Sequence, residues 1–185
     1  MNKFIIYFLL SLVIISSFQC ARRSLPTGGF KDTLPPIMVN ASPKMNTVFF
    51  DKEKIKITFD EYIKLVDLTK QLIISPPLEF SKYKVKPEGT VSKRIQIELM
   101  DSLLDNTTYT FNFGESIIDN NEGNKLPFFN YAFSTGAVID SLEIKGKIID
   151  AYERITDTYT AIYLYPIDST FTDSTVFLEK PFYAT

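Results

Sequence analysis

The stretch Leu104-Asp105-Asn106-Thr107-Thr108-Tyr109-Thr110-Phe111-Asn112-Phe113 joins a turn signal to a strand signal. Its Asp-Asn pair favours a tight turn, because both side chains can hydrogen-bond to nearby backbone and Asn tolerates a positive φ. Beyond the pair, Tyr109, Phe111 and Phe113 alternate with Thr and Asn, so the three rings share one face. The stretch therefore predicts a strand with one packed face that begins directly after a turn.

The same period of two recurs along the rest of the chain. Large apolar residues alternate with polar ones at 54–60 and 94–99, with Met38 and Asn40 at 37–40, and with Asn130, Ala132 and Ser134 at 129–134, which places the large residues of each set on one face of a strand. A shorter apolar run at 72–74 precedes two prolines, and only 62–72 could hold a helical turn. Many short strands with Pro, Gly and Asn between them predict an all-β fold, an antiparallel β-sandwich.

The N-terminus has the organisation of a secretory signal peptide. A short positive start at Met1-Asn2-Lys3 precedes an apolar run from Phe4 to Phe18, and a small-polar stretch leads to Cys20. The run of about 15 residues is shorter than the roughly 20 that span a bilayer. We therefore predict a signal peptide at 1–19.

The position of Cys20 resembles the lipobox of bacterial lipoproteins, in which the thiol is diacylated and the chain is cut before it. This resemblance implies a covalent lipid at Cys20 and a membrane partner reached through that lipid. Residues 21–33 are rich in Arg, Ser, Gly and Pro and lack periodicity, so we predict a lipidated flexible tether at 20–34. The alternative is a signal peptide that happens to be followed by a cysteine.

Composition restricts the chemistry that the chain can perform. It has no histidine, which excludes Ser-His-Asp and Cys-His nucleophiles and the usual zinc and iron sites. One cysteine allows no internal disulfide bond, and a net charge of −2 predicts no nucleic-acid partner. The cations Lys82, Lys84, Lys86, Lys93 and Arg94 are interpreted as the solvated face of a hairpin. We predict that the protein is not an enzyme and holds no cofactor besides the lipid.

Five segments in order carry a resemblance to a family. They are Asp32-Thr33-Leu34-Pro35-Pro36, Ile57-Thr58-Phe59-Asp60-Glu61, Leu104 to Phe111, Ile118 to Asn124, and Tyr131-Ala132-Phe133-Ser134-Thr135-Gly136. Together they resemble the SbsA-type bacterial Ig-like domain, which implies an Ig-like Greek-key β-sandwich at 35–137. The leader with residues 26–33 resembles Bacteroidota lipoproteins that carry this domain directly after the tether.

A second unit is predicted after Leu142. Ile144 and Ile148 flank Gly146 in a strand that Asp150 ends, and 161–165 is an apolar run suited to a buried strand. Residues 141–151 resemble the opening of a transthyretin-like, carboxypeptidase-regulatory type of β-sandwich. The family would continue beyond Thr185, so we expect 142–185 to be an incomplete second β-sandwich and the chain to be a truncated product or fragment.

Three further sites are candidates. Tyr109 matches the tyrosine corner of Greek-key sandwiches, whose hydroxyl bonds to backbone just upstream. In the loop after Ile118, oxygen-bearing side chains could bind calcium, although Asn and Gly also simply make tight turns; the candidate ligands are Asp119, Asn121, Glu122 and Asn124. Thr33 lies in an Asp-Thr-Leu triplet that resembles O-glycosylation sites of Bacteroidota.

Function is inferred from the family resemblance. It implies a non-catalytic, lipid-anchored cell-envelope protein that uses its Ig-like domain for adhesion, scaffolding or domain presentation, with envelope proteins or glycans as partners. The alternative is a glycan-binding or nutrient-uptake accessory lipoprotein that uses exposed aromatics such as Phe128-Phe129. An enzyme is the third hypothesis, but Asp60 and Glu61 are strand neighbours on opposite faces and cannot flank one bond. No acidic run follows Cys20, so we expect the outer membrane and its periplasmic side.

Overall fold

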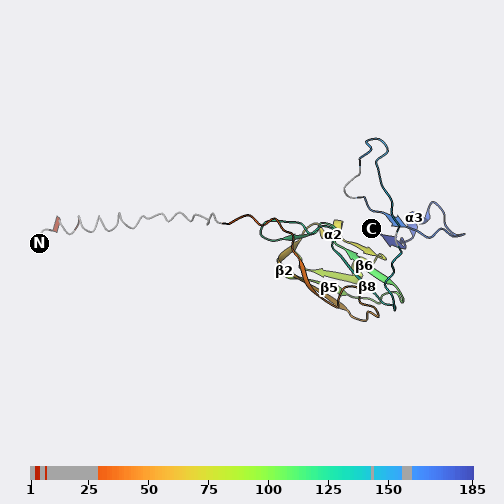
Figure 1. Ribbon diagram of the computed structural model, residues 1–185, viewed down its shortest axis with the longest axis horizontal. Helices are drawn as coiled ribbons and strands as arrows, with labels where there is room; N and C mark the ends of the chain where they lie inside the picture. The colour runs from red at the N-terminus through yellow and green to blue at the C-terminus, as the bar shows by residue number, and fades with distance from the viewer. Residues whose placement is uncertain (1–2, 5–6, 8–28, 143, 156–159) are drawn as a thin grey trace. The chain divides into compact units, whose positions relative to one another are not determined.

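The computed structural model describes residues 3–4, 7, 29–142, 144–155 and 160–185. The chain divides into two compact units, Met1–Lys31 and Asp32–Thr185. The second unit contains the sandwich (Figure 1). Cys20 and the predicted signal peptide other than positions 3, 4 and 7 lie outside the described residues.

The first sheet is antiparallel and has the strand order β1-β2-β5-β4. Its strands are β1 (Met38–Ser42), β2 (Lys54–Leu65), β5 (Ser92–Leu99) and β4 (Tyr83–Lys86). The long strand β2 also pairs, through its last three residues, with β7 (Ile117–Asp119). The strands β4 and β5 form the hairpin whose solvated face was predicted from the cations in this stretch. Lys84, Lys86 and Arg94 are exposed on it.

The second sheet has the order β3-β6-β8 and is also antiparallel. It consists of β3 (Ile73–Ser75), β6 (Thr108–Asn112) and β8 (Asn130–Ser134). If β1 to β6 and β8 are lettered A to G, the two sheets read ABED and CFG, which is the arrangement of constant-type immunoglobulin domains. The strand β7 is an addition in the connection from F to G. The all-β, Ig-like Greek-key sandwich predicted from the sequence is confirmed.

The core lies between the inner faces of the two sheets. Period two predicted these faces on β2, β5, β6 and β8, where the buried residues include Ile55, Ile57, Phe59, Ile95, Ile97, Leu99, Tyr109, Phe111, Tyr131 and Phe133. The ring of Phe133 is central, because it stacks on Phe50 with centroids 3.9 Å apart and lies 5.7 Å from the ring of Tyr109. Each buried large side chain contributes roughly 1.5–3 kcal/mol through burial.

The strand β1 departs from the simple alternation. Val39 is 65% exposed, as is Ile37 just before the strand at 60%, whereas Met38 packs against the core and Ala41 is buried. The register of β1 against β2 shifts between Met38 and Asn40, which is a β-bulge. A bulge puts two residues opposite one, so the face on which later side chains lie changes.

Helical structure in the sandwich is limited to short turns. The helix α2 (Leu68–Gln71) lies within the segment 62–72 for which a helical turn was expected, although Tyr62 to Leu65 still belong to β2. A 3-10 turn, η1 (Phe80–Lys82), leads into β4. The connection between β3 and β4 therefore carries the chain from one sheet to the other within a few residues.

The C-terminal segment forms little regular structure. It has the strands β9 (Tyr163–Leu164) and β10 (Tyr183–Ala184), which pair with each other, and the helix α3 (Thr175–Leu178). The strand expected between Ile144 and Asp150 is not formed, and described residues 144–155 are all exposed. A pair of two-residue strands cannot enclose a core. Assignment of 142–185 to a transthyretin-like domain stays a prediction.

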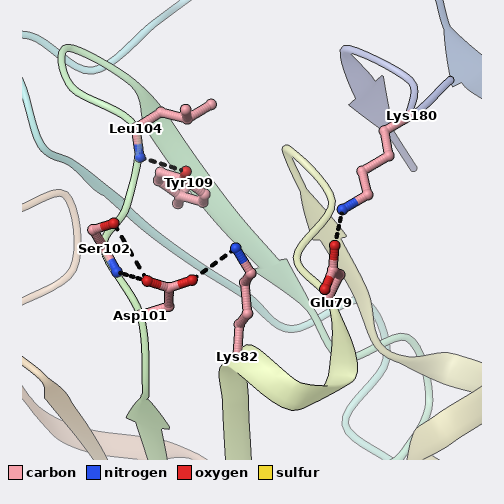
Figure 2. Close-up of polar contacts among 7 residues, drawn as sticks. All are labelled: Glu79, Lys82, Asp101, Ser102, Leu104, Tyr109 and Lys180. Carbon is pink, nitrogen blue, oxygen red and sulfur yellow. Dashed lines mark hydrogen bonds and ion pairs between the residues drawn. The ribbon is translucent and has the colours of Figure 1, made fainter.

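Contacts to the sandwich come from the end of this segment. The Ala184 amide donates to the Ser75 hydroxyl at 3.1 Å, and Ala184 is buried. Lys180 Nζ lies 2.6 Å from Glu79 Oε1, an exposed ion pair (Figure 2). Because exposed pairs contribute little, the segment is held mainly at β10, and the stretch before residue 155 has few restraints.

We predict that limited trypsin digestion cuts first after Lys145, Lys147 or Arg154 and leaves a resistant core that ends at Lys145, a few residues beyond Gly136. The three sites are exposed and outside strands, whereas Lys54 and Lys56 are within β2. Protease cuts backbone that can open locally at low cost. The order of cleavage would be read by mass spectrometry of timed samples, and simultaneous cleavage of β2 and the C-terminal segment would contradict it.

Candidate functional site

The hydroxyl of Tyr109 accepts a hydrogen bond from the Leu104 amide at 3.0 Å, five residues upstream (Figure 2). This contact has the geometry of a tyrosine corner at the start of strand F. The ring is buried and stacks on Phe133, so the residue joins the core to the turn before β6. Nearby, Asp101 accepts from Lys82 at 2.7 Å and from the Ser102 amide, which orders the approach to this turn.

The chain leaves the sandwich beside the same turn. The Thr135 hydroxyl donates to the Leu104 carbonyl at 2.7 Å, and the Thr107 amide donates to that hydroxyl at 3.0 Å. The next residue, Gly136, is so close that a Cβ atom there would lie 2.9 Å from the Cα atom of Asn106. The Thr-Gly pair of the last family segment therefore docks the end of β8 onto the turn that Tyr109 holds.

Asp119 organises the turn at the opposite end of the sandwich. Its Oδ1 atom accepts from the amides of Glu122 and Gly123 at 2.7 and 3.1 Å, and its Oδ2 atom accepts from the Asn124 amide at 2.6 Å. Gly123 adopts φ 82°, a conformation that favours glycine. Both carboxylate oxygens are thus used by backbone, as in the turn alternative of the sequence analysis.

The pKa of Asp119 depends on these contacts. Burial of the carboxyl group by itself raises its pKa, but the hydrogen bonds from the Glu122, Asn124 and Gly123 amides outweigh burial and hold the pKa below its ordinary value of 3.8. Hydrogen bonds to the charged form stabilise that form. Asp119 is therefore a buried carboxylate that remains ionised at neutral pH.

The other candidate calcium ligands have different tasks in the structure. The side-chain amide of Asn124 donates to the carbonyls of Asp32 and Leu34 at 3.2 and 3.0 Å, which attaches the N-terminal segment to this turn. Glu122 is exposed, and the Asn121 Oδ1 atom lies 3.5 Å from the side-chain nitrogen of Asn120. Within the described ranges, no group of three or more His, Cys, Asp or Glu is placed to hold a metal ion. Calcium binding here stays an untested prediction.

Thr33 lies between the two carbonyls that Asn124 contacts and is exposed. The Leu34 amide donates to Asp32 Oδ1 at 2.9 Å, so the Asp-Thr-Leu triplet forms a local turn at the surface. The accessibility that O-glycosylation needs is present at this position. Modification of Thr33 remains a prediction.

Asp60 and Glu61 are not arranged as a catalytic pair. Asp60 Oδ1 accepts from the Ile37 amide at 2.9 Å, and the Asp60 amide donates back to the Ile37 carbonyl, so this carboxylate holds β1. Burial raises the pKa of Glu61, and the neighbouring charges of Asp119 and Asp60 raise it further. These two acids help to make one end of the sandwich acidic.

The aromatic pair Phe128-Phe129 does not form an exposed row. Phe128 is 71% exposed, whereas the ring of Phe129 packs on Phe59 and Phe113 with centroids 5.7 and 6.0 Å apart. Of the two rings, only that of Phe128 is therefore largely accessible for a sugar to stack on. The exposed aromatic row that the glycan-binding alternative expected is reduced in this loop to a single ring.

The predicted lipid attachment point, Cys20, lies outside the described residues. In the part of the chain that is described, no helix has the length and apolar character that crossing a membrane requires. The predicted anchor therefore depends on the sequence pattern alone.

Comparison with family models agrees with the fold. Residues 32–135 match the family described as bacterial Ig-like domain, and because this match covers more than half of the chain, the chain belongs to that family. Among solved structures, the crystal structure of the N-terminal part of the bacterial S-layer protein SbsC is similar, with 21% identity and a TM-score of 0.31. The similarity covers 56% of this chain and 24% of that one, so this chain spans about a quarter of that structure. The comparison with curated proteins finds no match.

Tyr109→Phe is expected to destabilise the domain by about 1 to 3 kcal/mol, because it keeps the buried ring but leaves the Leu104 amide without its partner. For a domain of this size, 1 kcal/mol corresponds to roughly 4 to 8 °C in the unfolding midpoint. Thr110→Ala, on the opposite face of β6, should change stability by less than about 0.5 kcal/mol. Thermal unfolding followed by circular dichroism measures both, and an unchanged midpoint for Tyr109→Phe would show that the hydroxyl is idle.

Asp119→Asn should destabilise the protein by about 1 to 3 kcal/mol at pH 7, because an amide NH₂ group would replace an oxygen that accepts a backbone amide. The folded-state pKa of Asp119 is depressed, so its contribution is complete above the unfolded pKa near 4 and is lost as pH falls through the folded pKa. The difference in the free energy of unfolding between wild type and variant should therefore shrink below about pH 4. Urea unfolding at several pH values tests this, with exposed Asp105→Asn as the control.

Proposed function

We propose that this protein is a non-catalytic, lipid-anchored component of the bacterial cell envelope whose Ig-like domain serves adhesion, scaffolding or the presentation of other domains. Family membership supports the domain part of this proposal, since residues 32–135 match bacterial Ig-like domains. A fold of this kind carries many functions, so the argument depends on how the domain is connected.

The observation that carries the proposal is the position of the two connections. The N-terminal segment is attached by Asn124 to the turn after β7, beyond the end of β6. The chain leaves through Thr135 and Gly136, which lie against Thr107 and Asn106 before the start of β6. The chain therefore enters and leaves at opposite ends of the strands. Such a domain acts as an in-line spacer that separates its N-terminal attachment from the segment on its C-terminal side.

A lipid at Cys20 would complete this arrangement. Between Cys20 and Asp32 an extended chain reaches about 40 Å, which is enough to clear a membrane surface. Two or three acyl chains give stable attachment where one does not. The proposed location is the outer membrane, on its periplasmic side, since Ala21-Arg22-Arg23 offers no acidic run after the cysteine. Its proposed partners are envelope proteins or glycans that meet the domain beyond the tether.

Metabolic labelling with a fatty acid tests the anchor. Wild-type protein should incorporate label and fractionate with membranes, whereas Cys20→Ser should do neither, because the chain has no other thiol. Thr33→Ala serves as a control on the same tether and should keep the label. Equal labelling of wild type and Cys20→Ser would remove the anchor from the proposal. Protease added to intact cells then separates the periplasmic from the surface-exposed orientation.

A further inference from the structure

The outer face of the first sheet carries a cluster of positive side chains from three neighbouring strands. We name it the lysine face and define it as Lys54, Lys56, Lys84, Lys86 and Arg94, all of them exposed. In the register of the sheet, Lys54 and Lys84 lie on opposite sides of Glu98. Lys56 and Lys86 lie in the same way on opposite sides of Gln96. The central strand β5 therefore runs between two columns of lysines.

Acidic side chains are fewer than cations on this face. Asp60, farther along the outward side of β2, is exposed and accepts from the Ile37 amide. Glu98 lies within the lysine face, with Lys54 Nζ at 3.6 Å and Lys86 Nζ at 3.5 Å. Glu88, at the rim, is 3.9 Å from Lys84 Nζ. In the described part of the chain, neither Lys56 nor Arg94 has an ion-pair partner within 4 Å. The whole chain has a net charge of −2, so the face is a positive region on an acidic protein.

The spacing of these charges suits an extended polymer. The lysine columns on β2 and β4 are two strand spacings apart, about 10 Å, and successive positions on one strand face are about 7 Å apart. A shallow depression of about 490 Å³ lies over β4 and β5; among its lining residues are Lys84, Lys86, Thr90, Ser92, Arg94 and Gln96. A linear chain that lies along β5 would have cations on both flanks and polar side chains beneath it.

We propose that the lysine face binds a linear acidic polysaccharide along β5. The neutral side chains among the cations are hydroxyls and amides, as in Thr58, Ser92 and Gln96, which can hydrogen-bond to sugar hydroxyls. Around the five cations, the outward positions of β4, β5 and the first half of β2 hold no large apolar or aromatic side chain. The single exposed ring farther along β2, that of Tyr62, has Lys93 Nζ over it at 5.4 Å from the ring centroid. A bilayer-inserting surface and a base-stacking surface both need such side chains. A carboxylate-bearing glycan needs neither.

This inference does not rest on the lipid anchor, so the two proposals can fail separately. Binding of purified full-length chain to polygalacturonate, a linear glycan with one carboxylate per sugar, would be measured by titration calorimetry. Uncharged dextran is the comparison polymer. We expect saturable binding to polygalacturonate, no binding to dextran, and loss of binding as salt screens the charges.

The variant Lys56→Glu/Arg94→Glu should weaken binding to polygalacturonate by at least about tenfold, since each cation at an anionic surface contributes about tenfold or somewhat less. The double variant Lys44→Glu/Lys70→Glu makes the same change in net charge at exposed positions outside the lysine face and should bind as wild type does. Unfolding midpoints confirm that each variant is folded. If Lys56→Glu/Arg94→Glu does not fold, Lys56→Gln/Arg94→Gln provides the same comparison without added negative charge.

Three results would overturn the proposal. One is absence of binding to polygalacturonate at low salt. Another is equal weakening by the face variant and by Lys44→Glu/Lys70→Glu, which would show a response to net charge alone. The third is binding to phosphatidylglycerol vesicles, dependent on the lysine face, with none to polygalacturonate; the occupant would then be an anionic membrane surface.

Discussion

The two sheets of the sandwich are joined by aromatic side chains, because a chain with a single cysteine cannot form an internal disulfide bond. In antibody-type domains, a cysteine two residues after the corner tyrosine pairs with one on strand B. Here that position is Phe111, whose ring packs edge-on against Tyr83 of the first sheet with centroids 6.5 Å apart. Within the second sheet, Phe111, Tyr109 and Tyr131 contact the ring of Phe133. Phe50 stacks on the same ring from the loop after β1. Stacked and edge-on aromatic pairs stabilise the fold beyond the burial of their apolar surface. Packing of these rings can therefore take the place of the disulfide bond.

The ends of the sandwich are organised by polar contacts that depend on this core. At one end, the Tyr109 hydroxyl holds the turn onto which Thr135 and Gly136 dock. At the other, the buried carboxylate of Asp119 shapes the turn from which Asn124 reaches the N-terminal segment. Most of the family segments found in the sequence correspond to these contacts. They therefore describe how the domain is closed and connected.

Acidic and basic side chains gather in different regions of the folded domain, although they are interspersed along the sequence. Glu61 lies near Asp32, Asp60, Asp119 and Glu122, and their mutual repulsion contributes to its raised pKa. The outer face of the first sheet is instead lined with lysines from β2 and β4 on the two sides of β5. An acidic chain can thus present a positive surface, because sheet register gathers cations that are some 30 residues apart.

The sequence by itself determined the strand faces, the sandwich and the turn residues. Period two requires only that side chains alternate along a strand, which is a local property of extended backbone. It therefore identified the buried rings of β6 and β8 and the solvated hairpin of β4 and β5. The tyrosine at the start of strand F could also be recognised, since its partner lies five residues away.

Tertiary structure alone decided what depends on register and on distant contacts. Alternation does not say which face is packed, and the face of Ile37 and Val39 is the solvent face; the bulge after Met38 then turns Ala41 to the buried side. No local pattern shows that Asn124 contacts Asp32, or that Lys56 and Lys86 share one row across β5. Such pairings are set when the sheets pack, because the packing of one face selects a single register and the other face is then fixed with it.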